Sequence, residues 1–122
     1  MSGLTVYTLA NCDTCRRAVQ WLRARGLTFA ERPIRETPPT LGELRRMLAA
    51  HDGNFRRLCN TAGRDYREMG LAEKLPAMSE SEALKLLAAN GNLVKRPFLL
   101  GPGLALIGFE EEVWREKLPE KL

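Results

Sequence analysis

Long apolar runs are missing from this sequence: none approaches the roughly 20 residues that a transmembrane helix needs. The first residues also lack the basic segment and long apolar stretch of a secretory signal. Aromatic residues make up only 7%, and no dense basic region interleaved with aromatics, the pattern typical of nucleic-acid binding, is present. We therefore expect a cytoplasmic protein that binds neither a membrane nor nucleic acid directly.

Cysteine and histidine are scarce, with three cysteines and one histidine. Cys12 and Cys15 form a C-x-x-C pair, which in a cytosolic chain indicates redox or metal chemistry rather than a structural bridge. Structural zinc sites usually show two closely spaced ligand pairs, and here the second pair is missing. We therefore expect no metal site; the alternative is a zinc site made by the C-x-x-C pair, Cys59 and His51.

The remaining composition is that of an ordinary globular protein, with 44% hydrophobic and 28% charged residues. A chain of 122 residues is long enough to bury one core without disulfide bonds. We therefore expect residues 1–122 to form a single domain.

The charge is mildly positive, +4 overall, but the basic residues are unevenly distributed. Between positions 16 and 35 only Glu31 opposes a group of six arginines. These are Arg16, Arg17, Arg23, Arg25, Arg32 and Arg35. This distribution permits anionic ligands or partners.

The first 35 residues predict a β-α-β unit. Residues 4–9 are β-branched and aromatic, which favours a strand. A helix is expected from Thr14, with apolar residues at helical spacing and a C-cap at Gly26. Residues 27–34 return to strand character, and Pro33 favours an edge position. Two parallel strands joined by a helix are the simplest arrangement.

The next segment, residues 37–91, is predicted to be mostly helical. Thr40 with Glu43 and Ser79 with Glu82 have the spacing of two helix-capping boxes. Leu41, Leu44, Met47 and Leu48 would form the apolar face of the first helix, which ends near His51–Gly53. Shorter helical turns are expected around residues 55–59 and 66–69.

The last part of the chain predicts a hairpin and a helix. Residues 97–100 and 104–107 are apolar strands separated by a Gly-Pro-Gly turn. Residues 110–118 form an amphipathic helix with acidic residues in its first turn. With residues 37–91 set aside, the order β-α-β and β-β-α is that of the thioredoxin/glutaredoxin core. We therefore expect an α/β protein of this kind with a helical insertion.

Cys12 lies at the predicted junction between strand and helix. A thiolate there faces unpaired N–H groups and the positive end of the helix dipole, and Arg16 adds positive potential. Cys12 is therefore the expected nucleophile. Cys15, one turn into the helix on its buried face, is the expected resolving thiol. The alternative is that both are small residues of the core.

Arg96 and Pro97 directly precede the hairpin. In a thioredoxin-type fold this place holds a cis-proline beside the active cysteine, so we expect a cis bond before Pro97. The Arg96 guanidinium could then hydrogen-bond an anion on the Cys12 sulfur. With Arg16, Pro97 would contact the substrate. Alternatively Arg96 is simply solvated. Cys59 is expected to be buried, with a second resolving role as the alternative.

Four motifs together resemble the arsenate reductase (ArsC)/Spx family, and its glutaredoxin-like branch in particular. They are N-C-D-T-C-R-R-A near the start, L-C-N-T-A-G-R-D-Y-R-E-M-G-L in the middle, K-R-P-F-L-L and the late I-G-F. The resemblance covers nearly the whole chain. It implies a thioredoxin-like core with a helical insertion, a redox nucleophile at Cys12 and the anion-contacting arginine at Arg96. It also implies a thiol electron donor, glutathione or thioredoxin/glutaredoxin, with no bound cofactor.

The resemblance leaves two functional classes open. Arsenate reductases carry further arginines where this chain has Asn60 and near Ile107–Gly108, so we expect little or no arsenate turnover. The C-x-x-C pair resembles that of Spx, a redox-sensing regulator that binds RNA polymerase. The leading hypothesis is a thiol oxidoreductase. The alternative is an Spx-like regulator that binds the polymerase α subunit, with Gly53 at the place of the docking glycine.

Overall fold

A four-stranded sheet organises the computed structural model, which describes residues 3–118. The order of the strands is β2-β1-β3-β4. Their bounds are β1 Leu4–Thr8, β2 Phe29–Pro33, β3 Phe98–Gly101 and β4 Leu104–Ile107. Helix α1, Asp13–Ala24, connects β1 to β2, and helix α6, Glu111–Lys117, follows β4.

The register of the sheet brings distant segments to one end of β1. Strand β1 runs parallel to β2, with Thr8 opposite Pro33. It runs antiparallel to β3, with Tyr7 opposite Phe98. The chain therefore leaves β1 toward Cys12 at the same end of the sheet where β2 ends and β3 begins. Strand β2 is an edge strand, as its proline indicates.

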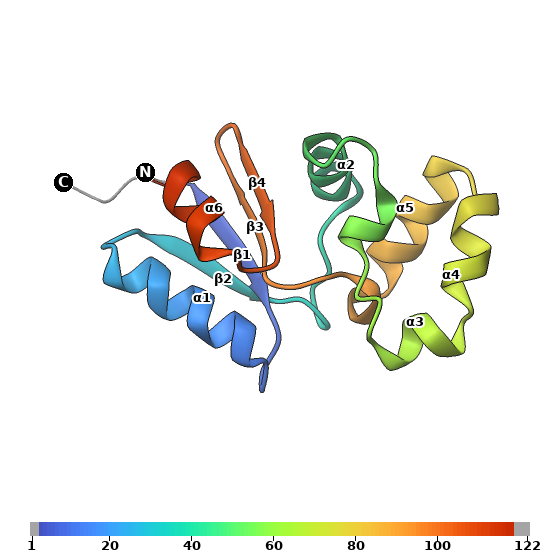
Figure 1. The fold of residues 1–122 in the computed structure, drawn as a ribbon, viewed down its shortest axis with the longest axis horizontal. Helices are drawn as coiled ribbons and strands as arrows, with labels where there is room; N and C mark the ends of the chain where they lie inside the picture. Colours follow the sequence, from blue (N-terminus) through green and yellow to red (C-terminus); the bar gives the residue numbers. More distant parts are fainter. Residues whose placement is uncertain (1–2, 119–122) are drawn as a thin grey trace.

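One face of the sheet is covered by α1 and α6. Alternate strand residues point to this side, because successive side chains of a strand face opposite ways. Val6, Leu99 and Leu106 pack here against Leu22 and Trp114 from the two helices. This layer holds α1 in place over the sheet. The N-terminus of α1 follows β1 after a short turn (Figure 1).

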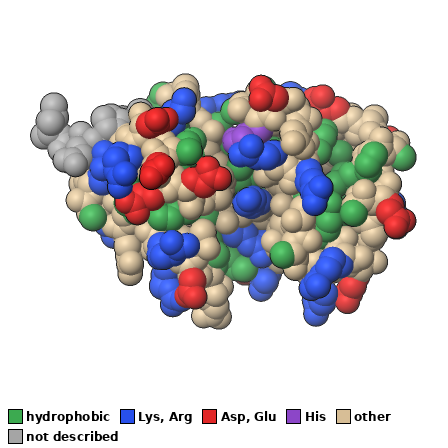
Figure 2. All heavy atoms as spheres, in the orientation of Figure 1, with side chains coloured by type: hydrophobic (Ala, Val, Ile, Leu, Met, Phe, Trp, Pro, Cys, Tyr) green, Lys and Arg blue, Asp and Glu red, His purple; other side chains and the backbone are tan. Residues whose placement is uncertain are grey.

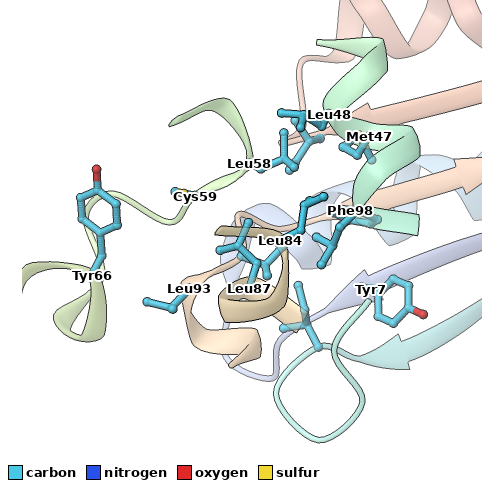
Figure 3. Packing of buried hydrophobic residues seen from close by; sticks show 14 of the residues in the cluster. Tyr7, Met47, Leu48, Leu58, Cys59, Tyr66, Leu84, Leu87, Leu93 and Phe98 are labelled. Carbon is cyan, nitrogen blue, oxygen red and sulfur yellow. The ribbon is translucent and has the colours of Figure 1, made fainter. Parts of the chain in front are cut away.

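The other face packs against the helical insertion, which Figure 1 shows gathered away from α1 and α6. It comprises α2 Leu41–Ala50, η1 Phe55–Leu58, α3 Arg64–Glu68, α4 Leu71–Lys74, η2 Leu75–Ala77, α5 Glu80–Ala89 and η3 Gly91–Leu93. Tyr7 and Phe98 of the sheet form one buried cluster with Met47, Leu84 and Leu87 of α2 and α5 (Figure 3). The sheet therefore lies between two hydrophobic layers.

Backbone contacts join η3 and the segment after it to the end of η1 and to the residue that follows β2. The Asn60 and Lys95 amides donate hydrogen bonds to the carbonyls of Leu93 and Leu58, at 2.8 Å each. Gly91 lies so close to Ile34 that a Cβ atom there would overlap the Ile34 carbonyl oxygen. Only a glycine allows this approach, which brings the residues after α5 against the end of β2.

The structure confirms the α/β class with a thioredoxin-like arrangement. Both capping boxes form: the Thr40 and Ser79 side chains accept from the Glu43 and Glu82 amides, while the two glutamates accept from the cap amides. Within residues 3–118 no helix has the length and hydrophobicity to cross a bilayer.

Three expectations differ from the structure. The strand expected over residues 27–34 covers only Phe29–Pro33. Leu27 is buried outside it, because it packs with α1 rather than pairing with β1. Leu41 is 37% exposed rather than inward-facing, because it starts the first turn of its helix. Helix α4, Leu71–Lys74, was not expected, because a four-residue helix has too few positions to show periodicity.

Candidate redox site

Cys12 is the N-cap residue of α1. Its backbone is extended, with φ −105° and ψ 110°, and its Sγ accepts a hydrogen bond from the Cys15 amide at 3.2 Å. The first N–H groups of a helix have no partner within the helix, and the Cys12 sulfur accepts from one of them. Cys12 is also partly exposed, which leaves its sulfur accessible to a substrate.

Cys15 differs from Cys12 in burial. Only 2% of it is exposed, and it packs on the inner face of α1. Burial raises the pKa of the Cys15 thiol to about 12, and hydrogen bonding and charge interaction with Cys12 act in the same direction. Arg96 acts in the opposite direction. At neutral pH Cys15 is therefore a protonated thiol beside Cys12.

A cavity of about 510 Å³ opens at these two cysteines, and we call it the thiol cavity. Its wall includes Arg16 and, from the edge of β2, Glu31 and Pro33. Arg16 forms an ion pair with Asp13 on the exposed side of α1. Cys12, Cys15 and Arg16, which were selected from sequence, therefore share one cavity.

Arg96 and Pro97 lie next to the end of β1, because Tyr7 pairs with Phe98. The bond between them is cis, as expected. Arg96 Nη1 donates to the Val94 carbonyl at 2.9 Å and to the Asn92 carbonyl at 3.2 Å. These two bonds use one terminal nitrogen and hold the guanidinium in a fixed orientation.

The charge of Arg96 interacts with both cysteines. Burial lowers the pKa of the guanidinium, the neighbouring Arg35 adds to that effect, and Cys12 and Cys15 oppose it. Arg96 nevertheless lines a separate cavity of about 350 Å³ rather than the thiol cavity. It therefore interacts with the cysteines and also borders a second polar recess.

Cys59 and His51 are not part of this site. Cys59 is 2% exposed and packs in the insertion core near Leu58 and Leu93 (Figure 3). Its Sγ donates to the Phe55 carbonyl at 3.3 Å, and burial raises its pKa to about 11. His51 Nδ1 lies 2.9 Å from the Met47 carbonyl at the end of α2. Within residues 3–118 no group of three or more His, Cys, Asp or Glu side chains could hold a metal ion.

The sequence does not predict which residues neighbour Arg96, although Arg35 belongs to the arginine group noted between positions 16 and 35. Arg35, Asp65 and Asn92 line the second cavity with Arg96. The position of Arg35 near this end of the sheet could be predicted from the sequence. Arg35 follows a strand parallel to β1, and the carboxyl ends of parallel strands share one edge of a sheet. The positions of Asp65 and Asn92 could not be predicted in this way, because only the packing of the insertion brings them to that edge.

The β-α-β and β-β-α topology, with a C-x-x-C pair at the first helix N-terminus, defines a protein of the thioredoxin-like class. Residues 7–117 match the model of the ArsC family, and the chain belongs to this family. The resemblance seen in the sequence is therefore confirmed.

Similar proteins include both solved structures and Spx regulators. The chain is 40% identical over 114 residues to the uncharacterized protein YusI of Bacillus subtilis, covering 93% of this chain and 97% of YusI. It is 28% identical to the global transcriptional regulator Spx of Enterococcus faecalis, covering 95% and 86%. The crystal structure of an ArsC family related protein from Bacteroides fragilis superposes with a TM-score of 0.88 at 36% identity, covering 97% and 98%.

Proposed function

We propose that this protein is a cytoplasmic thiol-dependent oxidoreductase with Cys12 as its redox nucleophile. The observation that carries this proposal is the N-cap position of Cys12, where a partly exposed sulfur accepts a helix amide and borders a cavity. A thiolate is the reactive form of cysteine, and a helix N-terminus stabilises it.

The proposed reaction has two sulfur transfers. The Cys12 thiolate attacks one sulfur of a disulfide substrate, the substrate S–S bond breaks, and the released thiolate takes a proton from solvent. The Cys15 thiol gives its proton to solvent and attacks Cys12 Sγ; the bond between Cys12 and the substrate breaks, the Cys12–Cys15 disulfide forms, and the second substrate sulfur leaves as a thiolate that takes a proton from solvent. The substrate gains two electrons and the cysteine pair loses two.

The first transfer prepares the second. Two of the causes that raise the pKa of Cys15 come from Cys12, its hydrogen bond and its charge. Both weaken when Cys12 is bound to substrate as a neutral mixed disulfide, whereas the attraction of Arg96 remains. Cys15 therefore ionises more readily at the stage where it must attack.

Arg96 is proposed to stabilise negative charge at Cys12 and on the leaving sulfur. Its fixed guanidinium interacts with both thiols. The proposed substrate contacts are Arg16 and Pro97. Arg16 lies on the wall of the thiol cavity, and Pro97 directly precedes β3, beside the end of β1. A second thiol compound or protein, glutathione or thioredoxin/glutaredoxin, then reduces the Cys12–Cys15 disulfide.

The test compares donors and substrates. Turnover is measured with glutathione and with thioredoxin as donors, against a model disulfide and against arsenate. We expect disulfide turnover that requires Cys12 and little arsenate turnover, because Asn60 cannot make the charge-assisted bonds of an arginine. If Cys12 in the native protein alkylates at pH 7 no faster than a free thiol, the proposal loses its basis.

Peptide mapping after mild oxidation tests the role of Cys15. We expect a Cys12–Cys15 disulfide with Cys59 free, because the first two cysteines lie within one helical turn and Cys59 lies in the insertion core. A Cys12–Cys59 bond would remove Cys15 from the reaction.

The second candidate function is an Spx-like regulator, favoured by the 28% identity to the Enterococcus faecalis protein over 86% of its length. In that case the Cys12–Cys15 disulfide is a switch, and the insertion, with Gly53 after α2, contacts the RNA polymerase α subunit. Co-purification with the α subunit under reducing or oxidising conditions supports this function. Absence of binding under both conditions removes it.

A further inference from the structure

Arg96 lines the cavity of about 350 Å³, which we call the arginine cavity. Arg35, Arg64 and Arg96 line it, and Asp65 is the acid among its lining residues. It shares no lining residue with the thiol cavity. Figure 2 shows Lys and Arg side chains gathered where the sheet meets the helical insertion. Three cations and one anion give this recess a local excess of positive charge.

Asn92 positions two of these arginines. Its Oδ1 accepts from Arg35 Nε at 2.7 Å, and its backbone carbonyl accepts from Arg96 Nη1 at 3.2 Å. Its Nδ2 donates to Asp65 Oδ2 at 3.2 Å. A cation on the amide oxygen and a carboxylate on the amide nitrogen allow one orientation of the amide. Arg35 and Arg96 are therefore both held by one residue at the junction of sheet and insertion.

Asp65 is committed to this framework. Its Oδ2 accepts from the amide nitrogens of both Asn90 and Asn92, at 3.2 Å each. These hydrogen bonds lower the pKa of its carboxyl, so it stays ionised at neutral pH. Its contact with Arg64 is looser, with Nε and Oδ1 3.8 Å apart. Asp65 thus orients Asn92 without neutralising the three arginines.

The position of the arginine cavity indicates what kind of anion it fits. Arg96 interacts electrostatically with Cys12, Cys15 and Arg35, and it lines the arginine cavity but not the thiol cavity. Arg35 and Arg64 line only the arginine cavity. A negative group bound there is therefore separated from the sulfur that reacts with Cys12. Such a group belongs to a substrate whose charge and reacting sulfur are different atoms joined by a short chain.

We propose that the arginine cavity binds the carboxylate of a small-molecule disulfide while Cys12 attacks its sulfur. This inference rests on the proposed oxidoreductase function and names its substrate class. A carboxylate suits the planar donor arrangement of a guanidinium. The sulfur transfers are those given above, with the carboxylate unchanged throughout. Arg35 and Arg64 are specificity-determining residues, and Asn92 is a positioning residue.

The test uses three disulfides that differ mainly in end-group charge. They are 3,3′-dithiodipropionate, the neutral bis(2-hydroxyethyl) disulfide and the dication cystamine. Reduced protein, freed of reductant, is mixed with each, quenched by acid, alkylated and analysed by mass spectrometry for Cys12 oxidation. Each rate constant is divided by that of 2-mercaptoethanol with the same disulfide, which removes differences in intrinsic reactivity.

We expect the normalised rate to fall in the order dicarboxylate, neutral, dication, with about a tenfold preference for the dicarboxylate over the neutral compound at low ionic strength. In Arg35→Gln this ratio falls toward one. Arg45→Gln, which changes an exposed arginine of α2 outside the cavity, keeps the wild-type ratio. Added salt reduces the preference, because Arg35 and Arg64 are exposed.

The outcomes separate this inference from the proposed function. Equal normalised rates for the three disulfides overturn the carboxylate site while leaving Cys12 as the nucleophile. An equal loss of preference in Arg35→Gln and Arg45→Gln also overturns it, since the overall positive charge would then explain the ratio. If none of the three oxidises Cys12 faster than it does a free thiol, the oxidoreductase function itself fails.

Discussion

Cys12 and Cys59 are both cysteines that cap a helix, but at opposite ends. Cys12 is the N-cap of α1, which packs on the sheet, and Cys59 is the C-cap of η1 in the helical insertion. The Cys12 sulfur accepts from an amide at the start of α1. The Cys59 sulfur, at the C-cap of η1, instead donates to the carbonyl of Phe55, the first residue of η1. An amide donor favours a thiolate, whereas a carbonyl acceptor favours a protonated thiol.

The comparison teaches that two thiols of one chain differ in burial and in the role of their sulfur in hydrogen bonding, and under the proposed function only Cys12 reacts. Cys12 is partly exposed beside a cavity, whereas Cys59 is 2% exposed among aliphatic side chains. Cys59 belongs to the buried cluster of the insertion, and Figure 3 shows it on the segment next to Leu58. The insertion therefore places Asn92 and Asp65, but not its cysteine, in the cavity that Arg96 lines.

The largest expected effect separates the two thiols by activity. Cys12→Ser should reduce disulfide turnover to the uncatalysed background, because the serine hydroxyl cannot replace the thiolate as the attacking nucleophile. Cys59→Ser, the matched control, should keep most of the activity. Steady-state turnover of a model disulfide measures both. Activity that survives in Cys12→Ser and disappears in Cys59→Ser would reverse the comparison.

Replacement of Gly91 tests how much the close contact between the insertion and the residue after β2 contributes to stability. Gly91→Ala should lower the free energy of unfolding by about 3 kcal/mol, since the new Cβ overlaps the Ile34 carbonyl and the backbones must separate. Gly42→Ala is the control: Gly42 lies in α2, and a Cβ there would meet only the Thr40 hydroxyl, at 4.0 Å, so alanine should stabilise by up to about 1 kcal/mol. Urea denaturation measures both, and equal effects would show that the close approach has no energetic consequence.

The role of Arg96 is sharpened by the rate of Cys12 alkylation. Arg96→Ala should slow the reaction of Cys12 with iodoacetamide at pH 7 about tenfold, because a neighbouring cation that favours the thiolate is lost. Arg96→Lys should restore part of the rate, since the charge returns without the planar donors. An unchanged rate in Arg96→Ala would leave the helix N-terminus as the sole activator of Cys12.

The smallest expected effect is the contribution of Cys59 to the pH dependence of stability. In the folded protein the pKa of the Cys59 thiol is about 11, which lies above that of a thiol in the unfolded chain. The unfolded state therefore loses its proton first, and stability falls as the pH rises through about 9 to 11. Between pH 7.5 and pH 10 this group should remove on the order of 1 kcal/mol of unfolding free energy.

Cys59→Ala provides the measurement of that effect. Its unfolding free energy should fall less between pH 7.5 and pH 10 than that of the wild type, whatever its stability at pH 7.5. Urea denaturation at both pH values gives the two differences. Cys15, with a pKa of about 12, contributes equally to both proteins and cancels in the comparison. Parallel losses in the two proteins would show that Cys59 has no raised pKa.

Local patterns in the sequence were enough to predict most elements. The capping residues Thr40 and Ser79 marked the starts of α2 and α5, because such caps depend on three or four consecutive residues. Residues 104–107 were predicted as a strand with the bounds that the structure has. Four-residue helices such as α4 were missed, because their formation depends on packing rather than on their own periodicity.

The sequence alone determined the class of fold and the placement of Cys12 at the start of a helix, since both follow from short-range order along the chain. Tertiary structure alone decided which groups face Arg96. Arg35, Asp65 and Asn92 are separated by 27 to 57 positions, and they meet only because Gly91 lets the end of the insertion approach the end of β2. Hydrogen bonds across such separations depend on burial of a common core, and no local pattern encodes them.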